Sequence, residues 1–369
     1  VGDATNYRPF ELNNTVCSSP VIRVTMASTG ASTVDATLSS VAARNWYAQL
    51  IGGTFTSATV RLTESGLTSS NAVASATAAQ SGPYTNQGGN SIAGGTITSN
   101  AAISYTGSTY FAIGTVPPAV VLSNNGTQVT AGNVVGGTTN VLLQQSALAV
   151  TIVNATLTGM TCTTAGSYFS ADITNLKAWY QTTSTFNAGT ATLLSTLTNP
   201  GAAGAKTFPS FVSQSITSGT TGYIFITADV AAGAVPGHTI NPSALTTTDF
   251  TFTKATKSGS TTAGGAQTII AGTATKLVYT VVPSTGTAGT AFSVTVQSQD
   301  VNGNPSNLAS ATTITLSKAT GSGTLSGVLT GSIGIGSNSV TIATPVYSMA
   351  DEMTLTATAS GGVTLTAVT

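Results

Sequence analysis

The chain has 369 residues and a formal net charge of zero, and only 5% of its residues are charged, where an average soluble protein has about 25%. Its ten lysines and arginines are scattered singly, so it lacks the basic stripe with which a protein neutralises nucleic-acid phosphates. No stretch approaches the roughly 20 consecutive apolar residues of a membrane helix, so the composition argues against both nucleic-acid binding and membrane insertion.

Strand is the predicted secondary structure almost throughout. Runs rich in Thr, Val, Ile, Tyr and Phe are separated at short intervals by Gly, Asn, Ser and Pro, and Ser75–Gln80 is the best short candidate for a helix. Many short strands punctuated by turns are typical of sandwiches and barrels, and the length fits two or three domains. We therefore predict an all-β fold class of three tandem antiparallel β-sandwiches, the last of them immunoglobulin-like.

The first predicted domain, an N-terminal β-sandwich, covers residues 1–115. Trp46 is its aromatic centre, and it is expected either to pack in the core or to form a glycan-stacking surface, since sugar-binding faces use exposed aromatic rings. The prolines Pro117 and Pro118 disfavour helix and internal strand pairing, so they are expected to mark the boundary. Strands are expected at Val21–Met26, Arg44–Leu50, Ala58–Thr63 and Tyr110–Ile113.

The central β-sandwich module is predicted over residues 116–271. In Gly219–Val230 apolar side chains lie on both faces of an alternating run, which is typical of a strand at the centre of a packed sandwich. Trp179 and Tyr180 lie on another predicted strand, where one ring is expected to face the core and the other the solvent. Trp179 is the second glycan-stacking candidate.

The immunoglobulin-like domain is predicted over residues 272–369, where apolar residues alternate regularly over six or seven short strands. Asp300, Asn302 and Asn304 place three oxygen-bearing side chains at alternate positions, so they are a candidate calcium site. The twelfth position of such a loop needs Glu and is Ala311 here, and Asn-Gly is first a turn signal. A turn is therefore the favoured interpretation.

No catalytic set is recognisable, and we expect neither an enzyme nor a bound cofactor. His238 is the single histidine, and it follows Pro-Gly without an activated serine motif, so it is interpreted as a turn residue. Asp351 and Glu352 are the adjacent acidic pair, but no sequence feature suggests the cleft that paired carboxylates need for glycoside hydrolysis. No other metal site is predicted.

Cysteine is sparse, with Cys17 and Cys162 in different predicted domains. Two cysteines do not form a disulfide framework, and they cannot make a zinc site alone. Two separate thiols are the favoured interpretation, and a bridge between neighbouring molecules is the alternative.

Several phrases resemble modules of the very long secreted and cell-surface proteins of Bacteroidota. They include RNWYAQLIGGTFTSATVRL in the first domain, SGTTGYIFITADV and LTTTDFTFTKATKSGSTTAGGAQTI in the second, and KLVYTVVPSTGTAGTAFSVTVQSQDVNGNPSN in the third. The resemblance implies adhesin-like or fibre-like proteins that are exported by the type IX route. A stretch like VGDATNYRP follows further upstream sequence in that family, so the chain is expected to be a piece of a longer product.

These observations predict an extracellular or cell-surface structural protein, the stalk or subunit of a surface fibre or adhesin. A surface with so few charges lacks the repulsion that keeps molecules apart, and uncharged edge strands can accept a neighbour's strand, so self-association is expected. Val1–Phe10 and Val363–Thr369 are the candidate donor strands. The alternative is an ancillary, carbohydrate-binding module of a secreted enzyme, with surface glycans as partners.

Overall fold

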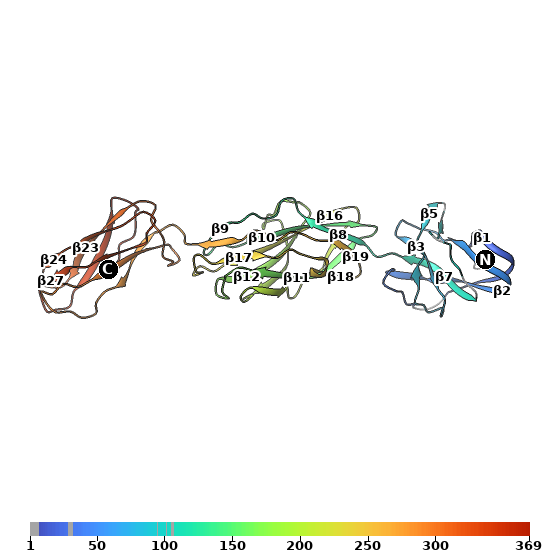
Figure 1. Cartoon of the computed structure of the whole chain (residues 1–369), viewed down its shortest axis with the longest axis horizontal. Coiled ribbons are helices and arrows are strands. Elements are labelled where there is room, and N and C mark those ends of the chain that lie inside the picture. The colour runs from blue at the N-terminus through green and yellow to red at the C-terminus, as the bar shows by residue number, and fades with distance from the viewer. Residues whose placement is uncertain (1–6, 29–31, 94, 101, 105–106) are drawn as a thin grey trace.

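The computed structural model describes residues 7–28, 32–93, 95–100, 102–104 and 107–369. Strands make up 55% of the chain and helix 1%, so the all-β prediction is confirmed. Among the described residues, every strand pairing stays within one of three ranges, 10–115, 119–270 or 276–368. The three domains lie in a row, with the N-terminal and C-terminal domains at opposite ends (Figure 1).

The first domain is built on one seven-stranded sheet, in which one long strand, β2, pairs with three of the others. β2 pairs with β1 along one edge, and with β7 and then β6 along the other. Trp46 is fully buried inside this domain, together with Phe111 and Val60. The strands are β1 (Phe10–Ser28), β2 (Ser40–Thr63), β3 (Asn71–Ala76), β4 (Thr85–Asn86), β5 (Asn90–Ala93), β6 (Thr96–Thr98) and β7 (Ser108–Thr115).

The helix candidate at Ser75–Gln80 was wrong. Ser75 and Ala76 end strand β3, which pairs with β7, and the residues after them form a bend and a turn. Ala has the highest helix propensity, but here pairing with a neighbouring strand overrides that preference.

The central domain packs two sheets around one large apolar core. One sheet has the strand order β13-β12-β16-β10-β8-β19, and the other has the order β14-β11-β17-β20-β9, with β15 and β18 also on β11. β16 lies inside its sheet with Phe225 and Ile226 fully buried, as its two-faced apolar pattern predicts.

Two pairings in this domain are parallel, β19 with β8 and β20 with β9, so both sheets are mixed rather than antiparallel throughout. The elements are β8 (Ala119–Asn124), β9 (Gly132–Val135), β10 (Val141–Thr151), β11 (Ala155–Ala165), β12 (Ile173–Gln181), β13 (Thr192–Thr198), β14 (Gly204–Thr207), β15 (Gln214–Ile216), β16 (Thr221–Val230), β17 (Thr239–Pro242), the 3-10 helix η1 (Thr247–Asp249), β18 (Phe250–Phe252), β19 (Thr256–Gly259) and β20 (Gln267–Ile270).

The third domain has two three-stranded sheets, β21-β22-β26 and β25-β23-β28, and a two-stranded pair, β24-β27. Val294 and Val296 of the first sheet and Ile314 and Leu316 of the second are buried in the same core. The arrangement is consistent with a sandwich, and its immunoglobulin-like identity stays a prediction. The strands are β21 (Lys276–Val281), β22 (Val294–Gln299), β23 (Thr312–Thr320), β24 (Leu325–Gly327), β25 (Thr330–Ile333), β26 (Ser339–Ile342), β27 (Pro345–Tyr347) and β28 (Thr354–Ser360).

No helix in the described residues is long and apolar enough to span a bilayer.

Candidate functional site

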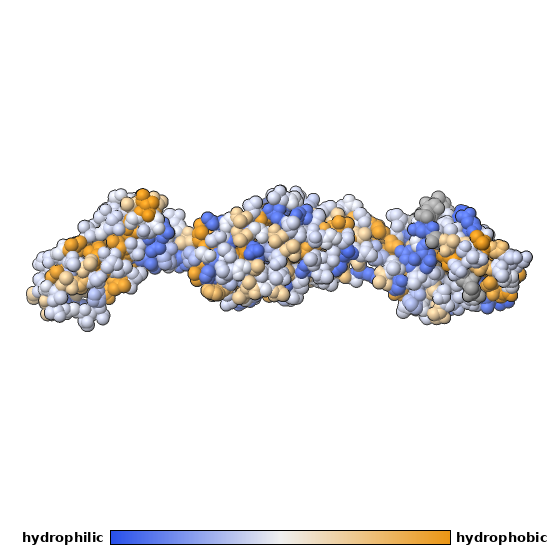
Figure 2. All heavy atoms as spheres, in the orientation of Figure 1, coloured by the Kyte–Doolittle hydropathy of each residue, from blue (hydrophilic) through white to orange (hydrophobic). Residues whose placement is uncertain are grey.

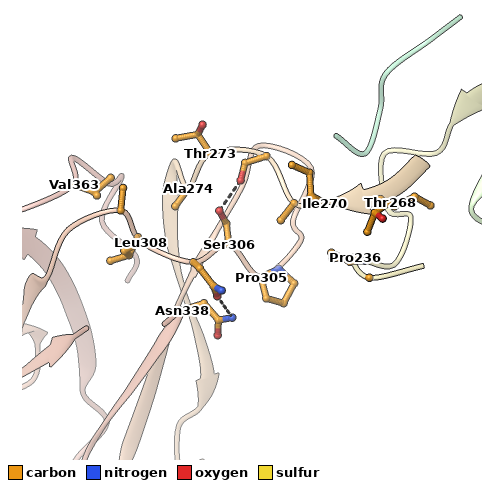
Figure 3. Close-up of a pocket in the computed structure, with 16 residues that line it drawn as sticks. Pro236, Thr268, Ile270, Thr273, Ala274, Pro305, Ser306, Leu308, Asn338 and Val363 are labelled. Carbon is orange, nitrogen blue, oxygen red and sulfur yellow. Dashed lines mark hydrogen bonds between the residues drawn. The ribbon is translucent and has the colours of Figure 1, made fainter. Parts of the chain in front are cut away.

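A cleft of about 750 Å³ lies at the joint between the second and third domains. Residues of the central domain, such as Pro236 and Thr268, face the β22–β23 connection and Asn338 of the third domain across it (Figure 3). None of the lining residues has an ionisable side chain. They are Pro236, Gly237, Thr268, Ile269, Ile270, Ala271, Gly272, Thr273, Ala274, Pro305, Ser306, Asn307, Leu308, Ala309, Asn338 and Val363.

Two side-chain hydrogen bonds join polar groups of the cleft. Ser306 Oγ donates to the carbonyl of Gly272, and Asn338 Nδ2 donates to Asn307 Oδ1 at 2.8 Å (Figure 3). A site of this composition can hold a molecule through hydroxyl, amide and backbone groups, but it offers no side chain that would transfer a proton.

The loop that carries Asp300, Asn302 and Asn304 forms the other side of this joint. Asn302 Nδ2 donates to the carbonyl of Gly136, and Asn304 Nδ2 donates to the carbonyl of Ala232, each at 2.9 Å. Both acceptors belong to the central domain. The two asparagine amides therefore clamp the third domain to the second.

Asp300 organises this loop from within and is fully buried. Its Oδ1 accepts the N–H of Asn304 at 2.9 Å, and its Oδ2 accepts the N–H of Gly272 at 2.8 Å. Burial alone would raise the pKa of Asp300, but these hydrogen bonds outweigh it, so the pKa lies below the usual value.

The calcium candidate stays a prediction, and its residues lie in a hydrogen-bonded turn. Both carboxylate oxygens of Asp300 already accept N–H groups, and the amide nitrogens of Asn302 and Asn304 point at carbonyls of the other domain. The residues form a turn, with Gly303 at φ 90° donating its N–H to the carbonyl of Asp300. Among the described residues, no group of three or more His, Cys, Asp and Glu could hold a metal ion.

Neither glycan-stacking candidate presents its ring to solvent. Trp46 is 0% exposed, and Trp179 is 8% exposed and donates Nε1–H to Thr227 Oγ1 at 2.9 Å. Tyr180 is also buried, so the expectation that one ring of the Trp179–Tyr180 pair faces solvent was wrong. The next ring along, Phe186, lies edge-on to Trp179 and covers it. A buried ring cannot stack on a sugar, so both tryptophans serve the core.

His238 is the last residue of a turn, in which its N–H donates to the carbonyl of Val235, and its side chain has a partner that the sequence pattern did not predict. Its Nδ1 lies 2.7 Å from Oδ2 of Asp172, whose side chain is 2% exposed. Burial would raise the pKa of Asp172, but N–H groups of Val235 and Phe169 and the imidazole of His238 outweigh it, so the pKa lies below the usual value. The two residues are 66 positions apart, and no local motif links them.

A second buried carboxylate is paired in the same domain. Lys177 Nζ lies 2.7 Å from Oδ2 of Asp229, which also accepts hydrogen bonds from the N–H of Asn140 and the side chain of Asn175. These carboxylates hold loops and strand ends together and lie outside the joint cleft.

The two cysteines are separate thiols within the chain, in agreement with the favoured interpretation. Cys17 is exposed on β1, and Cys162 is buried in the central core. Burial raises the pKa of Cys162 to about 12, which leaves it as an unreactive thiol.

The candidate donor strand at the C-terminus is already occupied. Val368 exchanges backbone hydrogen bonds with Ala357 within the third domain. Thr366 donates its N–H to the carbonyl of Thr275 and accepts the N–H of Leu277. Of the other candidate, Val1–Phe10, residues 1–6 lie outside the described residues, and Phe10 begins β1.

The sequence matches no protein-family model, and no curated protein is significantly similar to it.

Proposed function

We propose that this chain is a structural protein of the cell exterior, a stalk or subunit of a surface fibre or adhesin. The observation that carries the proposal is the arrangement of three independently cored β-domains in a row, with their terminal domains at opposite ends (Figure 1). A row of domains spans a larger distance than the same domains packed against one another. Because each domain buries its own apolar core, each resists extension separately.

The connectors between domains support this function because both of their ends are anchored. At the first connector, Val116 donates its N–H to the carbonyl of Ser70, and the carbonyl of Pro118 accepts the N–H of Thr256. Lys254 Nζ reaches across to the carbonyl of Asp35 at 3.2 Å. At the second connector the Asn302 and Asn304 clamp restricts the angle. Anchored connectors suit a stalk, since a force applied at one end is transmitted rather than absorbed by free hinges.

The surface supports self-association and an exterior location. Apolar residues form small patches between weakly polar ones on the face in Figure 2, and few charges separate them. The resemblance to modules of Bacteroidota surface proteins favours the same location and export by the type IX route.

Electron microscopy of the purified chain tests the proposal. We expect rods one domain wide and three domains long in negative stain, and end-joined rods or fibres as the concentration rises. Compact particles with the three domains folded against one another would refute the stalk function.

A second candidate, an ancillary module that binds carbohydrate for a secreted enzyme, is favoured by one observation. The joint cleft is lined by hydroxyl and amide groups that suit sugar hydroxyls, including Thr268 and Asn338. Glycan-array binding that is lost in Asn338→Ala but kept in Asn187→Ala, an exposed residue far from the cleft, would support this candidate.

A further inference from the structure

Three polar side chains of the central domain meet near the end of β16. They are Asp229 on β16 itself, Lys177 on β12, and Asn140 immediately before β10, and β16 pairs with both neighbouring strands. Nζ of Lys177 lies 2.7 Å from Oδ2 of Asp229 and donates to Oδ1 of Asn140 at 2.9 Å. One amine therefore contacts a carboxylate and a carboxamide at the same time.

Hydrogen bonds hold the carboxylate and the carboxamide in place. The backbone N–H of Asn140 donates to Oδ1 of Asp229 at 2.9 Å. Asn140 has φ 54°, a left-handed conformation that Asn adopts more readily than most residues. Nδ2 of Asn175 donates to Oδ2 of Asp229 at 2.9 Å, so both carboxylate oxygens are fixed.

The cluster is largely shielded from solvent. The side chain of Lys177 is 17% exposed and that of Asp229 is 8% exposed, and Asn140 is half-buried. The ring of Trp179 covers the amine on another side, with its centroid 5.9 Å from Nζ. Few water molecules therefore compete with the amine for the carboxamide.

The carbonyl carbon of Asn140 is within reach of the amine. Cγ is bonded to Oδ1 at about 1.2 Å, so Nζ lies no more than about 4.1 Å from Cγ. Groups that react in a folded protein gain most when they are held about 3–3.5 Å apart. A small rotation of the Lys177 side chain covers the difference.

From this geometry we propose that Lys177 and Asn140 become joined by an intramolecular isopeptide bond, with Asp229 as the group that moves the proton. The inference concerns the chemistry of the central domain alone and does not depend on the proposed stalk function. Burial would raise the pKa of Asp229, but its hydrogen bonds and the charge of Lys177 outweigh burial, so the pKa lies below the usual value. The reaction therefore starts from an ion pair.

The reaction needs no oxidant and no other reactant. A proton first passes from the ammonium group of Lys177 to the carboxylate of Asp229, which leaves a neutral amine as the nucleophile. Its nitrogen bonds to Cγ of Asn140, and the bond from Cγ to Nδ2 breaks. Nδ2 takes one proton from the amine and one from Asp229, so it leaves as ammonium and the carboxylate is restored.

The product would link two strands across the one between them. Lys177 and Asn140 are 37 positions apart, and β16 lies between β12 and β10 in the sheet. The bond would close this segment into a covalent loop, which a pulling force could not extend.

Mass spectrometry of the full chain tests the proposal. The intact wild-type protein should be lighter than its sequence by the mass of one ammonia molecule. After denaturation, cleavage before aspartate residues separates 35–171, which contains Asn140, from 172–228, which contains Lys177. We expect these two peptides to remain joined. The second peptide contains no cysteine, so a disulfide cannot imitate the link. Two separate peptides of full mass would overturn the proposal.

Variants test the role of each group. Lys177→Arg keeps the positive charge beside Asp229, but a guanidinium stays protonated and is no nucleophile, so the joined product should be lost. Asp229→Asn cannot take the proton and should lose it as well. Lys206→Arg is the matched control, because Lys206 is buried in the same domain and donates to backbone carbonyls of Pro200 and Ala202. It should keep the joined product. A link that persists in Lys177→Arg would refute this assignment, and circular dichroism confirms that each variant is folded.

Single-molecule stretching of the full chain gives an independent measurement. Unfolding of the central domain should release roughly 120–130 Å less length in the wild type than in Lys177→Arg, because 37 residues stay closed in a loop. Equal lengths would overturn the isopeptide bond. Elongated particles without the joined peptides would leave the stalk function intact, and compact particles with them would refute the stalk function alone.

Discussion

Asn304 of the third domain donates a side-chain N–H to the carbonyl of Ala232 in the second domain, at 2.9 Å. The same amide lies 3.1 Å from Asp300 Oδ2, so one side chain joins the two domains and the buried carboxylate of the joint. Together with Asn302, this contact makes the angle between the domains a property of specific hydrogen bonds.

Removing the clamp should loosen the joint without unfolding either domain. In Asn302→Ala/Asn304→Ala two interdomain hydrogen bonds are lost, each worth about 1 kcal/mol. Small-angle X-ray scattering should show a broader distribution of maximum dimensions. Asn307→Ala is the matched control, because Asn307 bonds to Asn338 within the third domain. Equal scattering of all three proteins would mean that the clamp does not set the angle.

Gly53→Ala should strongly destabilise the first domain. Gly53 has φ 70°, and a Cβ there would lie 2.0 Å from the carbonyl oxygen of Ser19 on β1. Gly66 has φ 73° and nothing within 4 Å, so Gly66→Ala isolates the cost of the backbone conformation, about 1–2 kcal/mol. Chemical denaturation should place Gly53→Ala clearly below Gly66→Ala in stability, and equal losses would exclude the steric clash as a cause.

Trp46→Ala should cost about 3–5 kcal/mol of the stability of the first domain, because it removes a fully buried ring from the core. Trp46→Phe keeps most of the apolar volume and should cost less. Calorimetry that follows the three domains should show the loss in the first domain alone. A loss of glycan binding without any loss of stability would contradict the core role.

Asp172→Asn should destabilise the central domain in a pH-dependent way. The pKa of Asp172 is lowered in the folded protein, so its contribution is complete above the unfolded-state pKa, near 3.8, and is lost as the pH falls through the folded-state value. The stability difference between wild type and variant should therefore be largest at neutral pH and shrink below about pH 4. Thermal unfolding between pH 7 and pH 3 measures it, with Glu352→Gln, at an exposed residue of the third domain, as the control. A difference that grows toward low pH would refute this account.

Much of the fold could be predicted from local pattern. Period-two alternation located the strands around Trp46, in Thr221–Val230 and around Ile314, because a strand with a buried face must repeat its apolar residues at that spacing. The parallel pairings of β19 and β20 could not be predicted, because alternation is the same in parallel and antiparallel strands. The candidate site was predicted only in part. The sequence identified Asn302 and Asn304 as part of a turn, but it did not reveal that their amides donate to carbonyls of another domain.

The sequence by itself determined that this is an all-β chain of low charge with a turn at Asn302-Gly303, because these properties depend on neighbouring residues. Only the tertiary structure decided that Asp172 meets His238, that both tryptophans are buried, and that two asparagine amides join neighbouring domains. Those contacts connect residues far apart in the chain. Their partners are set by how the sheets pack, which no local spacing encodes.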